Sequence, residues 1–253
     1  MTTDQEPNIL QHRHDGVLTL QIRRPEKKNA LTRSMYRALA EGLRSADADD
    51  EVRVVLIRGE EDCFTSGNDV NDFVNVPDAD EERPSVQFMQ AISGARKPVI
   101  AAVGGLAIGI GTTLLFHCDL VYAGENAFMQ LPFTRLGLCP EAGSSYLLPL
   151  IAGHQRASEL LLLGERFSAQ KAQEFGIVNE VLPDAGYLEH AMNRALELAG
   201  LPGEAVQTSK ALIKASQQPT LTGVIDTELA EFSRLLQTDE AQAIMQSFLN
   251  RRK

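Results

Sequence analysis

The chain has 253 residues, of which 43% are hydrophobic and 23% charged, and this suits one globular domain with a sizeable core. Its formal net charge of -10 disfavours a nucleic-acid partner, because phosphate backbones are bound by clustered Lys and Arg. Three distant cysteines and five histidines without metal-ligand spacing argue against a disulfide framework and a metal site. The polar N-terminus and the lack of a long apolar run predict a cytoplasmic protein that does not enter a membrane.

The first half of the chain predicts alternating strands and helices, which indicates a layered α/β fold. We expect strands over Val17–Arg23, Val52–Arg58, Pro98–Val103 and Asp119–Ala123. We expect helices over Asn29–Ala46, Pro84–Ser93 and Gly111–His117. The acidic, proline-containing segment Val74–Pro84 predicts a mobile surface loop.

The rest of the chain is mostly helical by its apolar spacing. The exception is a strand expected over Ile177–Leu182. Helices are expected over Ser144–Ile151, Gln155–Leu163, Ala169–Phe175, Tyr187–Ala199, Gly203–Ala215 and Thr220–Leu249, the last one broken near Thr238. We therefore divide the single domain into a core over 1–200 and a C-terminal helical region over 201–253.

Two glycine-containing segments follow predicted strands. Phe64–Val70 is first of all a turn signal, but Gly67 permits a positive φ that would turn the backbone N–H of Asn68 toward a ligand. Gly104–Thr113 fits neither a P-loop nor a dinucleotide-binding fingerprint, and it indicates either tight packing or a close backbone approach to a ligand. Neither segment alone separates a site from a packing feature.

Glu141 stands at a predicted helix start within Pro140–Ser145. Such a carboxylate is either a surface residue that complements the helix dipole or a base beside an apolar pocket. No Gly-x-Ser-x-Gly elbow surrounds Ser144 and Ser145, so neither is a good nucleophile candidate.

Taken together and in order, four segments resemble the crotonase (enoyl-CoA hydratase/isomerase) superfamily over nearly the whole chain. They are the opening loop Arg24–Leu31, the first amide loop Phe64–Val70, the second amide segment Lys97–Ile110 and the late helix-strand segment Ala169–Pro183. The resemblance implies a spiral of ββα turns followed by a C-terminal helical trimerisation region, and hence a homotrimer or hexamer. It also implies an acyl-CoA thioester substrate and no separate cofactor, since coenzyme A is part of the substrate.

The resemblance further implies that the backbone amides of Asn68 and Ile110 hold the thioester oxygen as negative charge develops there. Hydratases of the family use two glutamates, and the matching positions here hold Thr113 and Phe133. Glu141 stands where peroxisomal-type Δ3,Δ2-enoyl-CoA isomerases carry their single base. We therefore expect Glu141 to move a proton from C2 to C4 of a 3-enoyl-CoA in fatty-acid metabolism, with burial raising its pKa more than the helix dipole lowers it.

The resemblance implies further substrate contacts, which are Lys27, Lys28, Ala30, Ser66, Gly67, Asp69, Val70, Gly109, Phe133 and Leu138. The two lysines are equally well explained as a solvated pair. Phe133 and Leu138, with Phe73 and Phe88, are equally well explained as core residues. Phe248, Arg251 and Arg252 resemble a C-terminal segment that reaches a neighbouring subunit's ligand.

Two alternatives stay open at this point. One is another reaction of the superfamily, such as hydration, dienoyl isomerisation or thioester hydrolysis. Another is an acyl-CoA-binding protein that performs no chemistry. RNA binding is disfavoured by the net charge of -10.

Overall fold

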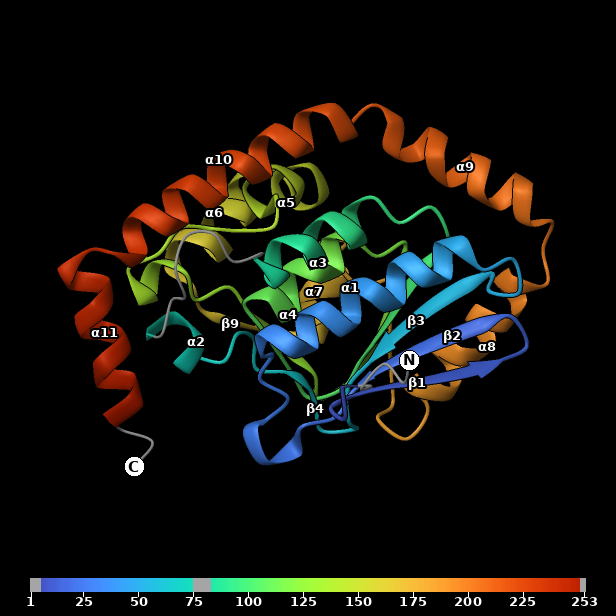
Figure 1. Cartoon of the computed structure of the whole chain (residues 1–253), viewed down its shortest axis with the longest axis horizontal. Coiled ribbons are helices and arrows are strands. Elements are labelled where there is room, and N and C mark those ends of the chain that lie inside the picture. The colour runs from blue at the N-terminus through green and yellow to red at the C-terminus, as the bar shows by residue number, and fades with distance from the viewer. Residues whose placement is uncertain (1–5, 75–82, 251–253) are drawn as a thin grey trace, which may run out of the picture.

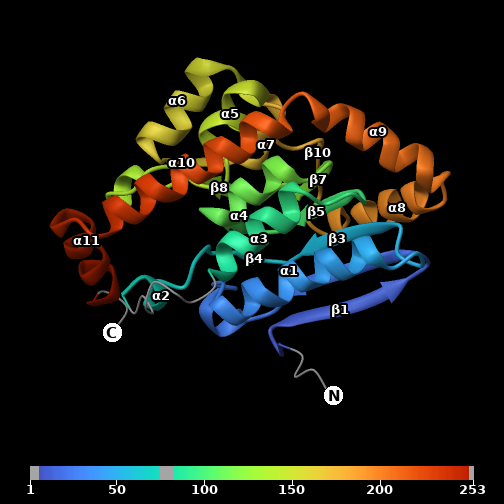
Figure 2. The same ribbon diagram turned by 45° about the horizontal axis from the view of Figure 1, so that its top comes forward.

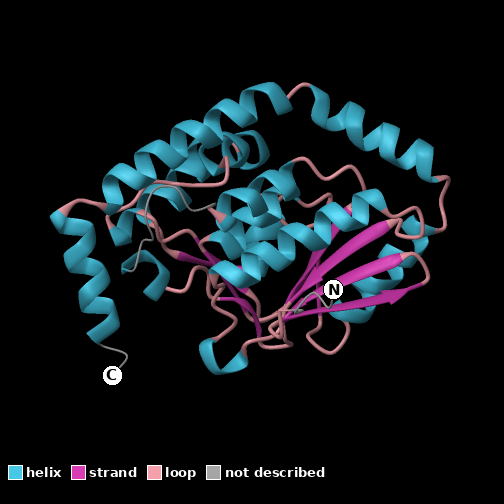
Figure 3. Cartoon of the chain, in the orientation of Figure 1, coloured by secondary structure: helices cyan, strands magenta, loops and turns pink. Residues whose placement is uncertain are grey.

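The computed structural model describes residues 6–74 and 83–250, and the side chains of 73, 74 and 248–250 fall outside that description. The expected loop over 74–84 and the roles considered for Phe73, Phe248, Arg251 and Arg252 therefore lie largely outside the described residues. Within the described part, strands and helices alternate as an α/β fold (Figures 1 and 3).

A six-stranded sheet forms the larger layer, in the order β1-β2-β3-β5-β7-β10. Its strands from β2 to β10 are parallel, and β1 joins the edge antiparallel to β2. The strands are β1 Ile9–His14, β2 Val17–Ile22, β3 Val54–Arg58, β5 Val99–Val103, β7 Leu120–Gly124 and β10 Glu180–Leu182.

A second sheet has four short strands in the order β4-β6-β8-β9, of which the first three are parallel. They are β4 Cys63–Thr65, β6 Leu106–Ile108, β8 Phe128–Gln130 and β9 Arg166–Ser168. Each of β3, β5 and β7 is followed by the next strand of this second sheet and then by helical structure. The chain thus makes ββα turns that advance along both sheets together.

Helices cover both faces of the larger sheet (Figures 1 and 2). Helices α1 (Arg33–Ala48) and α3 (Pro84–Ser93) pack together on one face, and α8 (Tyr187–Ala199) contacts the other face. Alternation along the strands explains this arrangement, since Val55 and Ile57 join the core with α1 and α3 while Val54 and Leu56 pack with α8. Strands buried on both faces are typical of a parallel sheet between helices.

The remaining helices lie around this core. Near the second sheet are α2 (Asn71–Val74), α4 (Ile110–Thr113), α5 (Ser144–Ala152), α6 (His154–Leu163) and α7 (Ala169–Glu174). Short 3-10 helices occupy Pro25–Lys27, Leu114–His117 and Thr134–Leu136. The C-terminal helices α9 (Gly203–Ala215) and α10 (Gln218–Leu236) form an arch over the core, and α11 (Asp239–Asn250) follows at its end (Figure 1).

The structure corrects several predicted boundaries. The first helix begins at Arg33 rather than Asn29, because Thr32 is its N-cap and accepts a hydrogen bond from the Met35 N–H at 3.3 Å. Asn29 instead has a left-handed backbone, and its amide group donates to the carbonyls of Cys63 and Phe64. The expected helix over Gly111–His117 is one α-turn from Ile110 followed by a 3-10 turn, and the expected strand at Ile177 begins at Glu180.

Candidate active site

Phe64–Val70, the first amide segment, runs from β4 to the start of α2. Gly67 has φ +89, and a methyl group at that position would lie 2.7 Å from the carbonyl oxygen of Ile108. A short bridge pairs Asn68 with Leu31: the Leu31 N–H donates to Gly67 O at 2.8 Å, and the Asp69 N–H donates to Leu31 O at 2.9 Å. This pairing uses the groups on either side of the Asn68 N–H and leaves that amide without an acceptor among the described residues.

The second amide segment, Lys97–Ile110, ends where β6 connects to α4 through Gly109. Gly109 has φ 59 and ψ -119, a conformation that only glycine adopts without strain. It turns the chain into α4, whose first residue is Ile110. An amide in the first turn of a helix has no partner within that helix, and within the described chain the Ile110 N–H donates to no other group either. Since Gly67 lies against Ile108, both free amides belong to segments in direct contact.

Glu141 is buried, with 3% of its surface exposed. The Thr113 hydroxyl donates to its Oε1 at 2.9 Å. Burial raises the pKa of the Glu141 carboxyl to about 7, the Thr113 hydrogen bond opposes this rise, and the nearby Glu228 carboxyl adds to it. The surface alternative for Glu141 is therefore wrong, and desolvation dominates its pKa as expected.

Thr113 connects Glu141 to the second amide segment. It lies one helical turn after Ile110 in α4, so this single turn presents a free N–H at its start and a hydroxyl bonded to Glu141 at its end. Thr113 stands where the family resemblance places a hydratase glutamate. Instead of supplying a second carboxylate, it hydrogen-bonds to the one present.

The turn after Glu141 corrects the expectation that this residue starts a helix. Ala142 and Gly143 both have positive φ, at 57 and 73, and α5 begins only at Ser144. The carboxylate at the N-terminus of α5 belongs to Glu228 of α10, which accepts from the Gly143 and Ser145 amides at 2.6 and 2.9 Å. Glu141 therefore does not cap α5, which agrees with its raised pKa.

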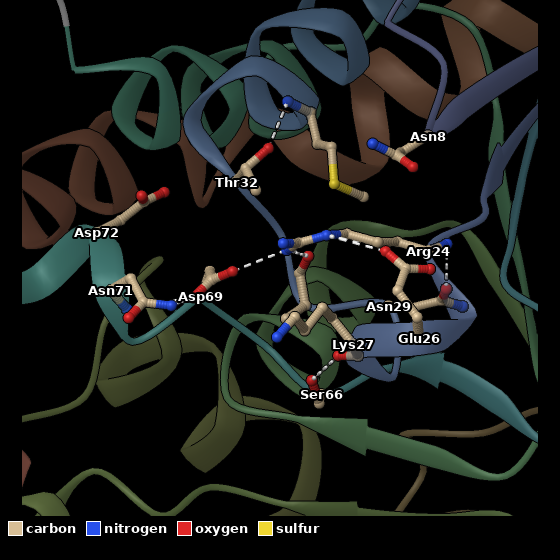
Figure 4. Close-up of polar contacts among 12 residues, drawn as sticks. Asn8, Arg24, Glu26, Lys27, Asn29, Thr32, Ser66, Asp69, Asn71 and Asp72 are labelled. Carbon is tan, nitrogen blue, oxygen red and sulfur yellow. Dashed lines mark hydrogen bonds and ion pairs between the residues drawn. The ribbon is translucent and has the colours of Figure 1, made fainter. Parts of the chain in front are cut away.

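The opening loop packs against the first amide segment (Figure 4). Arg24 donates to Asp69 Oδ2 at 2.7 Å and to Ala30 O at 3.0 Å. Burial opposes ionisation of Asp69, but the bonds from Arg24 and Asn71 outweigh it and lower the pKa of the carboxyl. Asp69 thus anchors the loop in its ionised form, and its two oxygens are engaged by protein groups.

The other expected contact residues divide into exposed and buried groups. Lys27 and Lys28 are exposed beside the first amide segment, where Lys28 O accepts from the Ser66 N–H at 3.0 Å. Val70 packs against the core, and Ala30 is buried. Phe133 and Leu138 are buried in the same hydrophobic cluster as Ile110, and Phe88 packs its ring against Tyr36.

Three residues near the candidate site were not expected from the sequence. The Tyr36 hydroxyl donates to the Asn68 side-chain oxygen, so α1 supports the first amide segment. His117 bonds the Ala142 carbonyl at 2.7 Å, and Glu228 accepts from the amides of Gly143 and Ser145. Tyr36 and Glu228 lie on longer helices and His117 ends a buried 3-10 helix, and in each case the sequence context alone gives no sign of the contact.

Among the described residues, no three His, Cys, Asp and Glu side chains gather as a metal site, and no helix has the length and apolar character needed to span a membrane. What the site does combine is a carboxyl whose pKa is near 7 with two unpaired amides on adjoining segments. A carboxyl of this kind can exchange protons at neutral pH, and unpaired amides can stabilise an oxyanion.

Comparisons with known proteins identify the family and the fold of the chain. Residues 12–253 match the sequence model for enoyl-CoA hydratase/isomerase. The solved structure of Pseudomonas aeruginosa OdaA superposes with a TM-score of 0.93 at 48% identity, covering 96% of this chain and 99% of that one. The fold is thus the expected crotonase-type spiral.

Curated relatives include both isomerases and hydratases. Enoyl-CoA delta isomerase 2 of Homo sapiens is 33% identical over 94% of this chain, which spans 62% of that relative's length. The 2,3-dehydroadipyl-CoA hydratase of Escherichia coli K12 is 34% identical over 96% of both chains. With a match along almost the full sequence and a shared fold, the chain belongs to the enoyl-CoA hydratase/isomerase family.

Proposed function

We propose that this protein is a Δ3,Δ2-enoyl-CoA isomerase of fatty-acid metabolism. The observation that carries the proposal is the buried carboxyl of Glu141, whose hydrogen-bond partner Thr113 occupies a hydratase glutamate position. Phe133 occupies the other hydratase position and cannot activate water. Addition of water needs groups to position and deprotonate it, whereas moving a double bond needs only one base.

In the proposed mechanism, ionised Glu141 removes a proton from C2 of a 3-enoyl-CoA. The electron pair delocalises onto the thioester oxygen to give a dienolate. The Asn68 and Ile110 amides donate to this oxygen, and one such donor is worth about 3 kcal/mol in the transition state. Protonated Glu141 then returns the proton to C4, which gives the conjugated trans-2-enoyl-CoA and regenerates the carboxylate.

A pKa near 7 suits both halves of this cycle. A base with a pKa close to the working pH is ionised often enough to accept the proton and acidic enough to return it. An ordinary exposed glutamate would be a much weaker base. The burial of Glu141 therefore supports a proton-shuttling role.

A second candidate is hydration of a 2-enoyl-CoA, favoured by the 34% identity to the Escherichia coli hydratase. Incubation of the protein with a 3-enoyl-CoA and, separately, with a 2-enoyl-CoA distinguishes the two activities. We expect conjugated product from the first and no 3-hydroxyacyl-CoA from the second. Hydration of the 2-enoyl-CoA at a comparable rate, without isomerisation, would refute the proposal.

Replacement of the base tests the mechanism directly. Glu141→Gln should lower kcat by about 10³-fold or more, because general-base catalysis is lost while coenzyme A ester binding is kept. The matched control is Glu174→Gln, which neutralises an exposed glutamate of α7 and should retain full activity. Wild-type protein in D₂O should also introduce deuterium at C2 or C4, whereas a binding protein without activity would introduce none.

A further inference from the structure

Glu228 is a buried carboxylate on the C-terminal helix α10, and 7% of its surface is exposed. It accepts three hydrogen bonds from the turn that follows Glu141: from Gly143 N at 2.6 Å, from Ser145 N at 2.9 Å and from Ser145 Oγ at 2.5 Å. Both carboxylate oxygens are used. Glu228 therefore fixes Gly143, the last residue before α5, and Ser145, in the first turn of α5.

The turn itself requires such support. Ala142 has φ 57, a left-handed conformation that a residue with a Cβ rarely adopts. From the other side, His117 donates its Nε2–H to the Ala142 carbonyl, since a carbonyl can only accept. Burial lowers the pKa of His117 to about 4, so this imidazole is neutral at physiological pH.

α10 also packs directly against the turn. A methyl group at Gly143 would lie 2.3 Å from Leu221 Cδ1, which leaves no room for a side chain there. A shift of α10 would thus move the turn and the base with it. The C-terminal helix and the candidate base are mechanically connected through Leu221 and Glu228.

The surroundings of Glu141 contain few other charges. The groups that face it are the Thr113 hydroxyl, the Tyr36 phenol, the neutral His117 bonded to the next residue, and Glu228. No cation within hydrogen-bonding distance neutralises Glu228 in the described chain. The Cys139 thiol is a further titratable group nearby, and the Glu228 charge contributes to raising its pKa. Two buried carboxyls therefore share one region, and burial raises the pKa of both. The Lys214 ammonium donates to the His117 carbonyl at 3.0 Å and is bonded to neither carboxyl.

On this basis we propose that Glu228 is a positioning residue for Glu141: it holds Gly143 and Ser145, which follow the base, and it places a second carboxylate beside it. The inference rests on the proposed function, because it assigns Glu228 a role in the reaction of Glu141. A carboxylate that served only to cap α5 would affect folding but not proton transfer. The two roles therefore predict different pH profiles.

The test is the pH profile of kcat/KM for a 3-enoyl-CoA in Glu228→Gln. Loss of a negative neighbour makes ionisation of Glu141 easier, so the acid limb should move down by half a pH unit or more. We expect kcat to fall about tenfold with KM changed less than threefold. The matched control is Glu231→Gln, which removes the same charge from an exposed site one turn further along α10 and should leave the profile unchanged.

Two more variants separate position from charge. Glu228→Asp keeps the charge but shortens the reach to Gly143 and Ser145, so the acid limb should stay while kcat falls. Ser145→Ala removes one of the three hydrogen bonds and should act in the same way, more weakly. Should Glu228→Gln fail to fold, an unchanged kcat in both of these variants would overturn the proposal.

A readout independent of activity separates this proposal from the proposed function. Carbon-13 labelling of glutamate carboxyls permits NMR titration of Glu141, assigned by its loss in Glu141→Gln. A downward shift of its titration in Glu228→Gln supports the electrostatic coupling even in a protein that isomerises no 3-enoyl-CoA. A Glu141 titration midpoint that moves by less than about 0.2 pH units in Glu228→Gln would overturn the proposal. An equal shift in Glu231→Gln would also overturn it.

Discussion

Glu141 must ionise to act as a base, yet it is buried where ionisation is costly. Because burial raises its pKa to about 7, the acid limb of kcat/KM should lie near pH 7, with activity rising as pH increases through this value. Initial rates at varied 3-enoyl-CoA concentrations, measured over a series of pH values, give kcat/KM and thus this limb. An acid limb near 4.5, the ordinary value for a glutamate, would show that burial does not raise the pKa of the base.

The same residue should make the wild type less stable at high pH than its neutral variant. Below pH 4.5 the carboxyl is protonated in both the folded and unfolded chains and contributes no difference. Between pH 4.5 and about 7 the folded chain binds the extra proton, so the free energy of unfolding falls as pH rises. Above pH 7 the cost of ionising the buried carboxyl reaches about 3 kcal/mol.

Glu141→Gln should therefore raise Tm at pH 8 and leave it nearly unchanged at pH 4. Thermal unfolding monitored across this pH range checks the prediction, with Glu174→Gln as the control for loss of an exposed charge. An increase in Tm that is the same at both pH values would mean that packing, rather than ionisation, is responsible. Stabilisation on removal of a buried catalytic group is a recognised trade-off between stability and activity.

At the scale of elements, the second amide segment depends on the backbone of Gly109. An alanine side chain would meet no atom within 4 Å there, so any effect of Gly109→Ala comes from φ 59 and ψ -119 rather than from a clash. Strain of this kind costs about 1–3 kcal/mol. We expect Gly109→Ala to lower kcat at least tenfold as the Ile110 amide turns away.

Gly223 offers a matched control within α10. A methyl group there also meets nothing within 4 Å, but the residue lies inside a regular helix. Gly223→Ala should raise stability by about 0.5–1 kcal/mol because alanine favours helix. Denaturant unfolding and kcat for both variants test the pair, and equal behaviour of the two would refute the argument from backbone conformation.

The elements show what the sequence alone permits. The long apolar runs of β3, β5 and β7 and the amphipathic pattern of α1 were predicted correctly because each carries a strong local signal. The second sheet was missed, since strands of three residues have too few positions to display a period and depend on pairing with distant segments.

The candidate site shows the same limit. Glu141, Asn68 and Ile110 were selected through motifs in family order, while Glu228 lies 85 residues from the Gly143 amide that it accepts from. No local pattern in α10 distinguishes this glutamate from its exposed neighbour Glu231. Contacts between the C-terminal helices and the turn at Ala142 arise only from the folded arrangement.

At the scale of the whole molecule, large apolar side chains of the described residues stay exposed on α5 and α6 (Leu150, Ile151, Leu162, Leu163) and on or just before α9 (Leu201, Leu212, Ile213). Leu162 and Leu163 end α6 with 67% and 53% of their surface exposed, and Leu212 and Ile213 of α9 are 72% and 74% exposed. Figure 2 shows α6 and α9 at different ends of the upper side. A ring assembly needs two unlike patches on each subunit, so this distribution supports the expected trimer, which we propose as the state in solution.

Light scattering coupled to size-exclusion chromatography tests this proposal. The wild type should have a mass three or six times the chain mass of 27.7 kDa. The double variant Leu212→Asp/Ile213→Asp should have a mass at or near 27.7 kDa, because unpaired carboxylates buried in an interface oppose association. Ala185→Asp places an acid on an exposed residue between β10 and α8 and should stay assembled. A double variant that keeps the wild-type mass would exclude α9 from the interface. A monomeric wild type would refute the proposed trimer.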